Sequence, residues 1–92
     1  MIKSFKCKNT EILFFDGKTK AFAAINKVAR MRLLSLDIAA SLSDLKLPPG
    51  NQLEALKGNR KGQYSIRINK QWRICFKWHS NDAYEVEIID YH

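Results

Sequence analysis

The hydrophobic period changes halfway along this 92-residue chain, and that change restricts the folds open to it. In the first half, apolar residues recur at every third or fourth position, which is the spacing of one face of an α-helix. In the second half, apolar and polar residues alternate, which is typical of strands with one buried face. Pro48-Pro49-Gly50 separates the two halves, because no helix continues through it. The chain is therefore predicted to be an α+β protein, with its helices in the first half and its sheet in the second.

Two helices are expected. The longer one carries a single apolar stripe, made of Phe22, Ile25, Ala29, Leu33, Leu36 and Ala40. A shorter helix is predicted over residues 9–16, with Asn9 or Thr10 as its N-cap and Gly17 as its terminator. We expect both helices to pack on one face of the sheet, with the stripe against the apolar side of the strands.

The predicted sheet is a small antiparallel meander. Alternation predicts strands over residues 64–69, 72–78 and 84–88, joined by short polar turns at 69–71 and 79–82. Residues 53–57 are a candidate fourth strand, and residues 1–6 alternate like a further N-terminal strand. A chain of this length forms one domain, so residues 1–92 are predicted to be a single unit.

Basic residues are concentrated in one part of the chain. The net charge is +7, which favours an anionic partner such as nucleic acid. The stretch from residue 57 to residue 77 has no Asp or Glu, and it contains Lys57, Arg60, Lys61, Arg67, Lys70, Arg73 and Lys77. Alternation places Arg67, Arg73 and Lys77 on the sheet face that the helices do not cover. Such a face suits a single-stranded polyanion, with phosphates supplying affinity and aromatic rings stacking on bases; the alternative is an ordinary solvated face.

The last three residues carry reactive groups. Asp90, Tyr91 and His92 follow the final strand and supply a carboxylate, a phenol and an imidazole. An RNA strand bound beside them would meet the groups needed for phosphodiester cleavage without a metal. The 2′-OH must lose a proton, the charge of the phosphorane must be held, and the 5′-oxygen must be protonated. The remaining carboxylates are spaced along a strand and its turn, so the sequence predicts neither a metal site nor a cofactor.

Several other functions are disfavoured. No run of residues has the length of an apolar membrane span, and the first residues are too short and too charged for a signal peptide. Cys7 and Cys75 lack metal-ligand spacing, and Cys75 is expected to be a buried thiol, which favours a reduced, cytoplasmic compartment. His79 is expected to be a surface residue in a turn.

The second half of the chain also resembles a known family. Residues 53–66, residues 69–76 with their Trp72-Arg73-Ile74, and the closing Asp90-Tyr91-His92 are similar to the HigB branch of the RelE toxin superfamily. The resemblance implies a type II toxin that cleaves mRNA in the A site of the 70S ribosome, without a metal, and so inhibits translation. It also implies a HigA-type antitoxin partner with a helix-turn-helix domain, in a hetero-oligomeric complex.

The resemblance also implies roles for individual residues. Lys57 and Arg73 would orient and stabilise the scissile phosphate. Tyr91 would orient the RNA or assist proton transfer, His92 would be the acid or base, and Asp90 would hold the site together.

One position departs from the family pattern, since some relatives have a histidine where this chain has Glu54. Glu54 could act as the base, pair with a nearby cation, or be silent. Two other functions stay open as alternatives: a gyrase-poisoning toxin of the related ParE type, and a non-catalytic module that binds RNA or the ribosome. The combination of Lys57, Arg73, Tyr91 and His92 argues against gyrase poisoning, because poisoning a topoisomerase needs no proton-transfer group.

Overall fold

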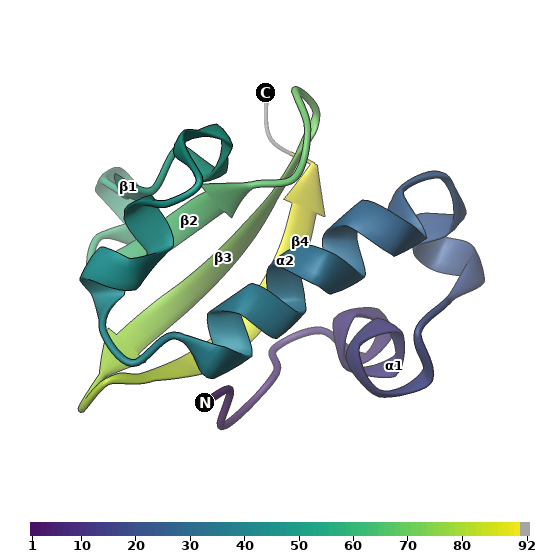
Figure 1. Cartoon of the computed structure of the whole chain (residues 1–92), viewed down its shortest axis with the longest axis horizontal. Coiled ribbons are helices and arrows are strands. Elements are labelled where there is room, and N and C mark those ends of the chain that lie inside the picture. Colours follow the sequence, from purple (N-terminus) through teal and green to yellow (C-terminus); the bar gives the residue numbers. More distant parts are fainter. Residues whose placement is uncertain (91–92) are drawn as a thin grey trace.

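The computed structural model describes residues 1–90 and consists of a four-stranded antiparallel sheet with helices on one side (Figure 1). The strands are β1 (Glu54–Ala55), β2 (Gln63–Arg67), β3 (Trp72–His79) and β4 (Asp82–Asp90), and they lie in the order β1-β2-β3-β4. The α-helices are α1 (Lys8–Asp16) and α2 (Asn26–Ile38). The predicted α+β class and the antiparallel meander are confirmed.

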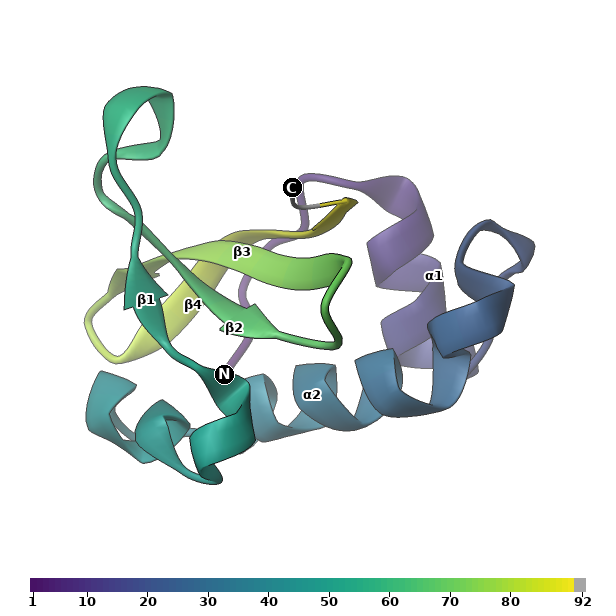
Figure 2. The same ribbon diagram turned by 90° about the horizontal axis from the view of Figure 1, so that it is seen from above.

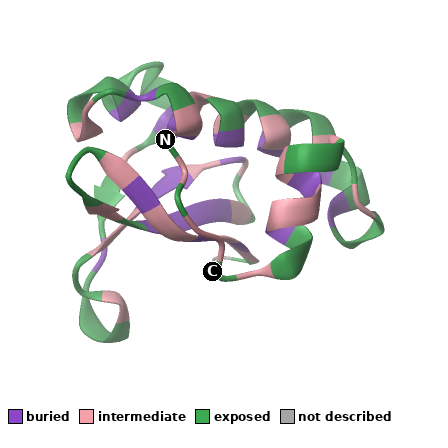
Figure 3. Ribbon diagram, turned by 90° about the horizontal axis from the view of Figure 1, so that it is seen from below, coloured by how far each residue is buried: buried purple, intermediate pink, exposed green. Residues whose placement is uncertain are grey.

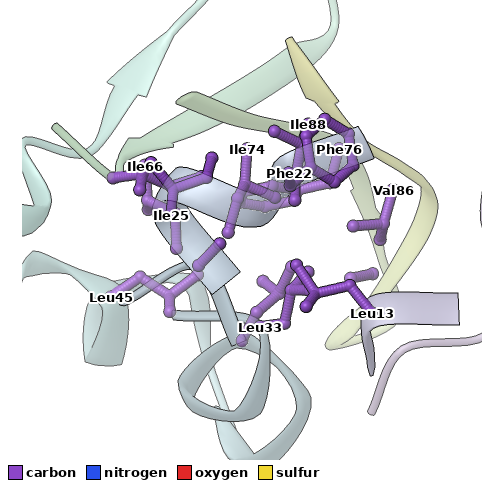
Figure 4. Packing of buried hydrophobic residues seen from close by; sticks show 14 of the residues in the cluster. Leu13, Phe22, Ile25, Leu33, Leu45, Ile66, Ile74, Phe76, Val86 and Ile88 are labelled. Carbon is purple, nitrogen blue, oxygen red and sulfur yellow. The ribbon is translucent and has the colours of Figure 1, made fainter. Parts of the chain in front are cut away.

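Helix α2 runs across one face of the sheet, and α1 lies beside the sheet, in contact with α2 and β4 (Figures 1 and 2). The core forms where α2 meets the sheet, with Leu33, Ile66 and Ile74 among its fully buried side chains (Figure 4). The side of α2 that faces the strands is buried, whereas much of its outer side is exposed (Figure 3). The segment between β1 and β2 projects from the other side of the sheet (Figure 2).

The predicted long helix is broken and shorter than its apolar stripe. A 3₁₀ helix, η1 (Lys20–Ile25), precedes α2, and Phe22 leaves helical geometry with φ −125° and ψ 33°. Phe22 is still buried and packs edge-on against Trp72. The apolar stripe therefore remains in the core although the backbone bends at this residue. At the other end, α2 stops at Ile38, and Ala39 is buried in place of the predicted Ala40. Extended backbone at Ala39 ends the helical period, which is why the prediction at Ala40 is wrong.

Helix α1 forms where it was predicted, but its N-terminus is different. Its N-cap is Cys7, and neither Asn9 nor Thr10 caps it. Thr10 is buried, and its hydroxyl accepts a hydrogen bond at 3.0 Å from the backbone N–H of Ile88 in β4. Gly17 ends the helix in the left-handed conformation, as predicted, because glycine has no Cβ to oppose a positive φ.

The N-terminal segment extends the sheet only through two isolated contacts. Ile2 and Phe5 form parallel bridges with Ala83 and Val86 of β4, so residues 1–6 lie along this edge without forming a continuous strand. Residues 40–52 contain two short 3₁₀ helices, η2 (Leu42–Lys46) and η3 (Pro49–Asn51), and β1 is shorter than the predicted strand over residues 53–57. In residues 1–90, no helix is long and apolar enough to cross a membrane.

Candidate active site

Arg73 is the centre of the candidate site. In β3 it lies opposite Arg67 of β2 and Ile89 of β4, on the sheet face away from α2, as the alternation predicted. It is nevertheless only 5% exposed. Burial at Arg73 was not predicted, and it arises because Gln52 and Glu54, at the start of β1, contact its guanidinium.

Four contacts hold the guanidinium of Arg73. Its Nε donates to Oγ of Ser65 at 2.8 Å. Its Nη2 donates to the backbone carbonyl of Gln52 and, at 3.4 Å, to that of Ser65. The same nitrogen lies 3.2 Å from a carboxylate oxygen of Glu54. A planar fork held at Nε and at one Nη has one orientation, so its charge is fixed in space rather than carried on a mobile side chain.

Glu54 therefore takes one of the three roles that were left open, which is pairing with a cation. It lies in β1 opposite Ser65, which brings its carboxylate to Arg73. Its side chain is 47% exposed, whereas the side chain of Arg73 is 6% exposed. Solvent weakens an ion pair of this kind, so Glu54 can leave Arg73 at modest cost when another anion arrives.

Asp90 ends β4 beside the site. It lies opposite Trp72, one position beyond the pair formed by Arg73 and Ile89. Its carboxylate accepts a hydrogen bond at 3.1 Å from the side-chain amide of Gln71. The predicted roles of Tyr91 and His92 fall on residues outside the described part of the chain, so these roles remain proposals.

Lys57 and Lys61 lie on the projecting segment. Lys57 is exposed and caps the short 3₁₀ helix η4 (Gly58–Arg60), and Lys61 directly follows that helix and is also exposed. Both ammonium groups are thus available to an anion that approaches the face of the sheet away from α2.

Two of the other predicted cations, Arg60 and Lys77, are paired with acidic residues. Arg60 lies 3.3 Å from the carboxylate of Glu87, and Lys77 lies 2.6 Å from that of Glu85. Both acids come from β4, outside the acid-free stretch but beside it in the sheet. The predicted purely basic face is therefore wrong where it borders β4. Lys70 is exposed in the β2–β3 turn and Arg67 is half-buried.

Cys75 is a buried thiol on this face, as predicted. Burial raises the pKa of its thiol, with smaller and opposing effects from the charged groups around it, of which Arg60 is the largest. A neutral, buried thiol is a packing residue and not a nucleophile.

Two residues of the site, Ser65 and Gln52, were not predicted from the sequence. Alternation along β2 places Ser65 on the sheet face away from α2, where its hydroxyl can contact a side chain of the neighbouring strand. This alternation is the signal that could have identified Ser65. Gln52 contributes only its backbone carbonyl, so its side chain carries no such signal.

Comparison with known proteins places the chain in a family. Residues 3–92 match the profile of the HigB-like toxins, described as RelE-like toxins of the type II toxin–antitoxin system HigB. The chain belongs to this family of toxins. It is 42% identical to Toxin HigB-1 of Vibrio cholerae over 80 residues, which cover 85% of this chain and 84% of that protein. It is 39% identical to Endoribonuclease HigB of Proteus vulgaris over the full length of both proteins.

Solved structures support the HigB-like toxin fold independently. The YoeB–YefM complex from Staphylococcus aureus includes a chain that matches with a TM-score of 0.61 at 20% identity, covering 100% of this chain and 98% of that one. YafQ from E. coli matches with a TM-score of 0.61 at 13% identity, covering 98% and 93%. At this level of identity the two neighbours show a shared fold alone. The predicted family and fold are both confirmed.

Proposed function

We propose that this HigB-like toxin is a metal-independent endoribonuclease that cleaves mRNA in the A site of the 70S ribosome, in the cytoplasm, and so inhibits translation and growth. The name of its full-length Proteus vulgaris relative, an endoribonuclease, supports the reaction class. The single observation that carries the proposal is the fixed guanidinium of Arg73. Arg73 lies opposite Ile89, one residue before the end of β4, and Tyr91-His92 follow that end in the sequence.

Arg73 is suited to hold charge that develops during cleavage. Attack on phosphorus places extra negative charge on the equatorial oxygens of the phosphorane. A preorganised donor stabilises this charge without reorganising at the moment of reaction. Ser65 and Gln52 supply that preorganisation by holding Nε and Nη2.

The proposed reaction is transfer of the phosphoryl group to the neighbouring 2′-oxygen. A base removes the proton of the 2′-OH, the 2′-oxygen bonds to phosphorus, and the bond to the 5′-oxygen breaks. The products are a 2′,3′-cyclic phosphate and a 5′-OH, which receives its proton from an acid. His92 is proposed for a proton-transfer step because imidazole titrates near neutral pH. Tyr91 is proposed to orient the RNA or assist this step, and Asp90 to support the site.

Lys57 and the remaining cations are proposed to bind the RNA backbone. Lys57 would contact the scissile phosphate together with Arg73, and its exposed position on the projecting segment supports this role. The flanking phosphates are proposed to meet cations of the same face, which are Arg60, Lys61, Arg67, Lys70 and Lys77. In the free protein the carboxylate of Glu54 forms an ion pair with Arg73, so a phosphate must displace this carboxylate to bind the guanidinium.

The proposed protein partner is an antitoxin of the HigA type with a helix-turn-helix domain. A type II toxin is encoded with a protein antitoxin, and the structural neighbour from Staphylococcus aureus is a toxin–antitoxin complex. Co-expression of the neighbouring reading frame, followed by co-purification and restored growth, tests this assignment.

Single-turnover cleavage of mRNA on programmed ribosomes tests the reaction. Arg73→Lys keeps the charge but loses the fork, so we expect cleavage to fall about 10²–10³-fold. His92→Gln is expected to abolish cleavage with little change in circular dichroism. Arg30→Lys is the matched control, because Arg30 lies on α2 and donates to the carbonyl of Phe14. Normal cleavage by both Arg73→Lys and His92→Gln would refute the proposal, and mapped mRNA ends would separate cleavage from gyrase poisoning or simple RNA binding.

A further inference from the structure

A pocket lies on the same sheet face, at its far end. Its volume is about 390 Å³, and it is formed where the β3–β4 hairpin meets the N-terminal segment. Its lining side chains are Ser4, Lys77, His79, Tyr84 and Glu85. His79 is the last residue of β3, so its predicted place in a turn is wrong; the turn consists of Ser80 and Asn81, which both have positive φ.

A β-bulge in β4 builds this pocket. Cys75 pairs with Glu87 and Lys77 pairs with Tyr84, so β4 has one residue more than β3 between these two pairs. The extra residue is Glu85, whose φ is +50°. The bulge brings Tyr84 and Glu85 together on the face that carries Lys77. A left-handed conformation is unusual for glutamate, and such outliers point to a local function more often than regular backbone does.

The bulge is held by specific contacts. The backbone N–H of Glu85 donates to Oγ of Ser4 at 2.8 Å, and its carboxylate lies 2.6 Å from Nζ of Lys77. The hydrogen bond from Lys77, together with its charge, lowers the pKa of the Glu85 carboxyl. The carboxylate is therefore ionised at neutral pH and can only accept hydrogen bonds. Beside it, the rings of His79 and Tyr84 lie 6.4 Å apart between centroids.

This pocket is separate from the site around Arg73. Glu87 lies between the two along β4, and its carboxylate is paired with Arg60 at 3.3 Å and with Lys6 at 3.6 Å. From Arg73 to His79 the strand spans about 20 Å. A residue in this pocket therefore does not touch the group that reacts at Arg73, but a single RNA strand lying along the face can reach both.

We propose that this pocket binds one nucleotide of single-stranded RNA, distant from the cleaved bond, and selects a base that carries an amino group. This inference rests on the proposed function. The ring of Tyr84, with His79 beside it, provides a stacking surface for the base. Lys77 has three N–H donors, of which the pair with Glu85 uses one, so others can reach a phosphate or ribose oxygen.

Glu85 supplies the selectivity. An ionised carboxylate accepts from the amino groups of adenine, cytosine and guanine, as acidic side chains do with the cytosine amino group in DNA recognition. Uracil has no amino group, and its one donor on the pairing edge, N3–H, lies between two carbonyl oxygens that repel a carboxylate. Glycine would adopt the conformation of the bulge with less strain, but it would leave the pocket without this acceptor.

Binding of uncleavable RNA to the intact protein tests the inference. The probes are fluorescently labelled 2′-O-methyl hexanucleotides of adenine, cytosine or uracil, in which the attacking 2′-oxygen is blocked. The wild-type protein is expected to bind the adenine and cytosine strands about tenfold more tightly than the uracil strand. Tyr84→Ala is expected to weaken all three by about tenfold, since it removes one stacking surface. Glu85→Gly is expected to abolish the preference while its thermal stability stays equal or rises, because glycine suits the bulge.

Two controls separate this result from general effects. Phe15→Ala removes an exposed aromatic ring from α1, which contributes no side chain to the pocket, and is expected to bind like wild type. On programmed ribosomes, Tyr84→Ala is expected to raise KM and leave kcat unchanged. Equal affinity of the wild type for the three strands, no binding to any of them, or a wild-type pattern in both Tyr84→Ala and Glu85→Gly would overturn the inference. Loss of cleavage in the Arg73 variants tests the proposed reaction separately.

Discussion

Nε of Arg73 donates a hydrogen bond to Oγ of Ser65 at 2.8 Å, and both residues are buried on the sheet face away from α2. The two side chains come from neighbouring strands, β3 and β2. This contact fixes the plane of the guanidinium, and the carbonyl of Gln52 holds its other end. The guanidinium is therefore fixed in one orientation before any substrate binds. Such preorganisation is the condition for efficient electrostatic stabilisation of a transition state.

Ser65→Ala is expected to slow cleavage on ribosomes about 10–100-fold, mainly through kcat. The reason is that Arg73 keeps its charge but loses the contact that aims it, and small misplacements are costly in a reaction of this kind. Single-turnover kinetics measures the effect. Ser43→Ala removes a hydroxyl from an exposed position in η2 and serves as the control. Unchanged kcat in Ser65→Ala would show that the hydrogen bond serves the fold alone.

Arg73→Ala is expected to lower the free energy of unfolding by about 1–3 kcal/mol, because the buried hydroxyl of Ser65 and the part-buried carbonyl of Gln52 lose their donor. The position of Arg73 on the face away from α2 would by itself predict no loss of stability. The burial of its guanidinium predicts that stability is lost. Arg67→Ala is the comparison, since the contact seen at Arg67 uses its backbone carbonyl, which accepts from Arg32. Denaturant unfolding of both variants measures the difference, and equal midpoints would contradict it.

Glu54→Gln is expected to lower KM for the ribosome-bound mRNA while kcat stays within about tenfold of wild type. The neutral amide holds Arg73 less strongly, so the phosphate displaces it more easily. A general base would behave differently, since its loss lowers kcat by about 10²–10⁴-fold and removes the acidic limb of the pH–rate profile. Glu11→Gln, which loses a surface pair with Lys8, is the control. A large fall in kcat would assign the base to Glu54.

Leu33→Ala is expected to cost about 2–5 kcal/mol of unfolding free energy, because Leu33 is fully buried between α2 and the sheet. Ile74→Ala, on the facing strand, is expected to cost a similar amount. The neighbouring Leu34 is 41% exposed, so Leu34→Ala is expected to cost less than about 1 kcal/mol. Guanidinium unfolding of the three variants tests the packing, and equal losses for Leu33 and Leu34 would place the core elsewhere.

Stability is expected to fall as the pH rises above about 8.5, in part through Cys75. Burial raises the pKa of this thiol in the folded protein, so the unfolded chain loses the proton first. The contribution of Cys75 is therefore complete below the pKa of the unfolded chain and is lost as the pH rises through the folded value. Unfolding curves from pH 7 to pH 10 test this, and Cys75→Ala is expected to show a shallower decline. A chromogenic disulfide reagent should react with Cys7 before Cys75.

The sequence by itself determined the architecture. Alternation along residues 64–69, 72–78 and 84–88 and the stripe on residues 22–36 are local signals, because each residue's face follows from the geometry of its own strand or helix. The same signals placed Arg73 on the sheet face away from α2, and that prediction is confirmed. The motif around Arg73 and the end of the chain also identified the toxin family.

Only the tertiary structure decided what surrounds these residues. Gln52 and Glu54 reach Arg73 from about 20 positions away in sequence, and Glu85 and Glu87 neutralise cations that stand in an acid-free stretch. Periodicity predicts the face of a residue but not what later covers that face, since the covering segment is joined through long-range strand pairing. The bulge at Glu85 has the same origin, because an extra residue in one strand is defined only by the register of its partner.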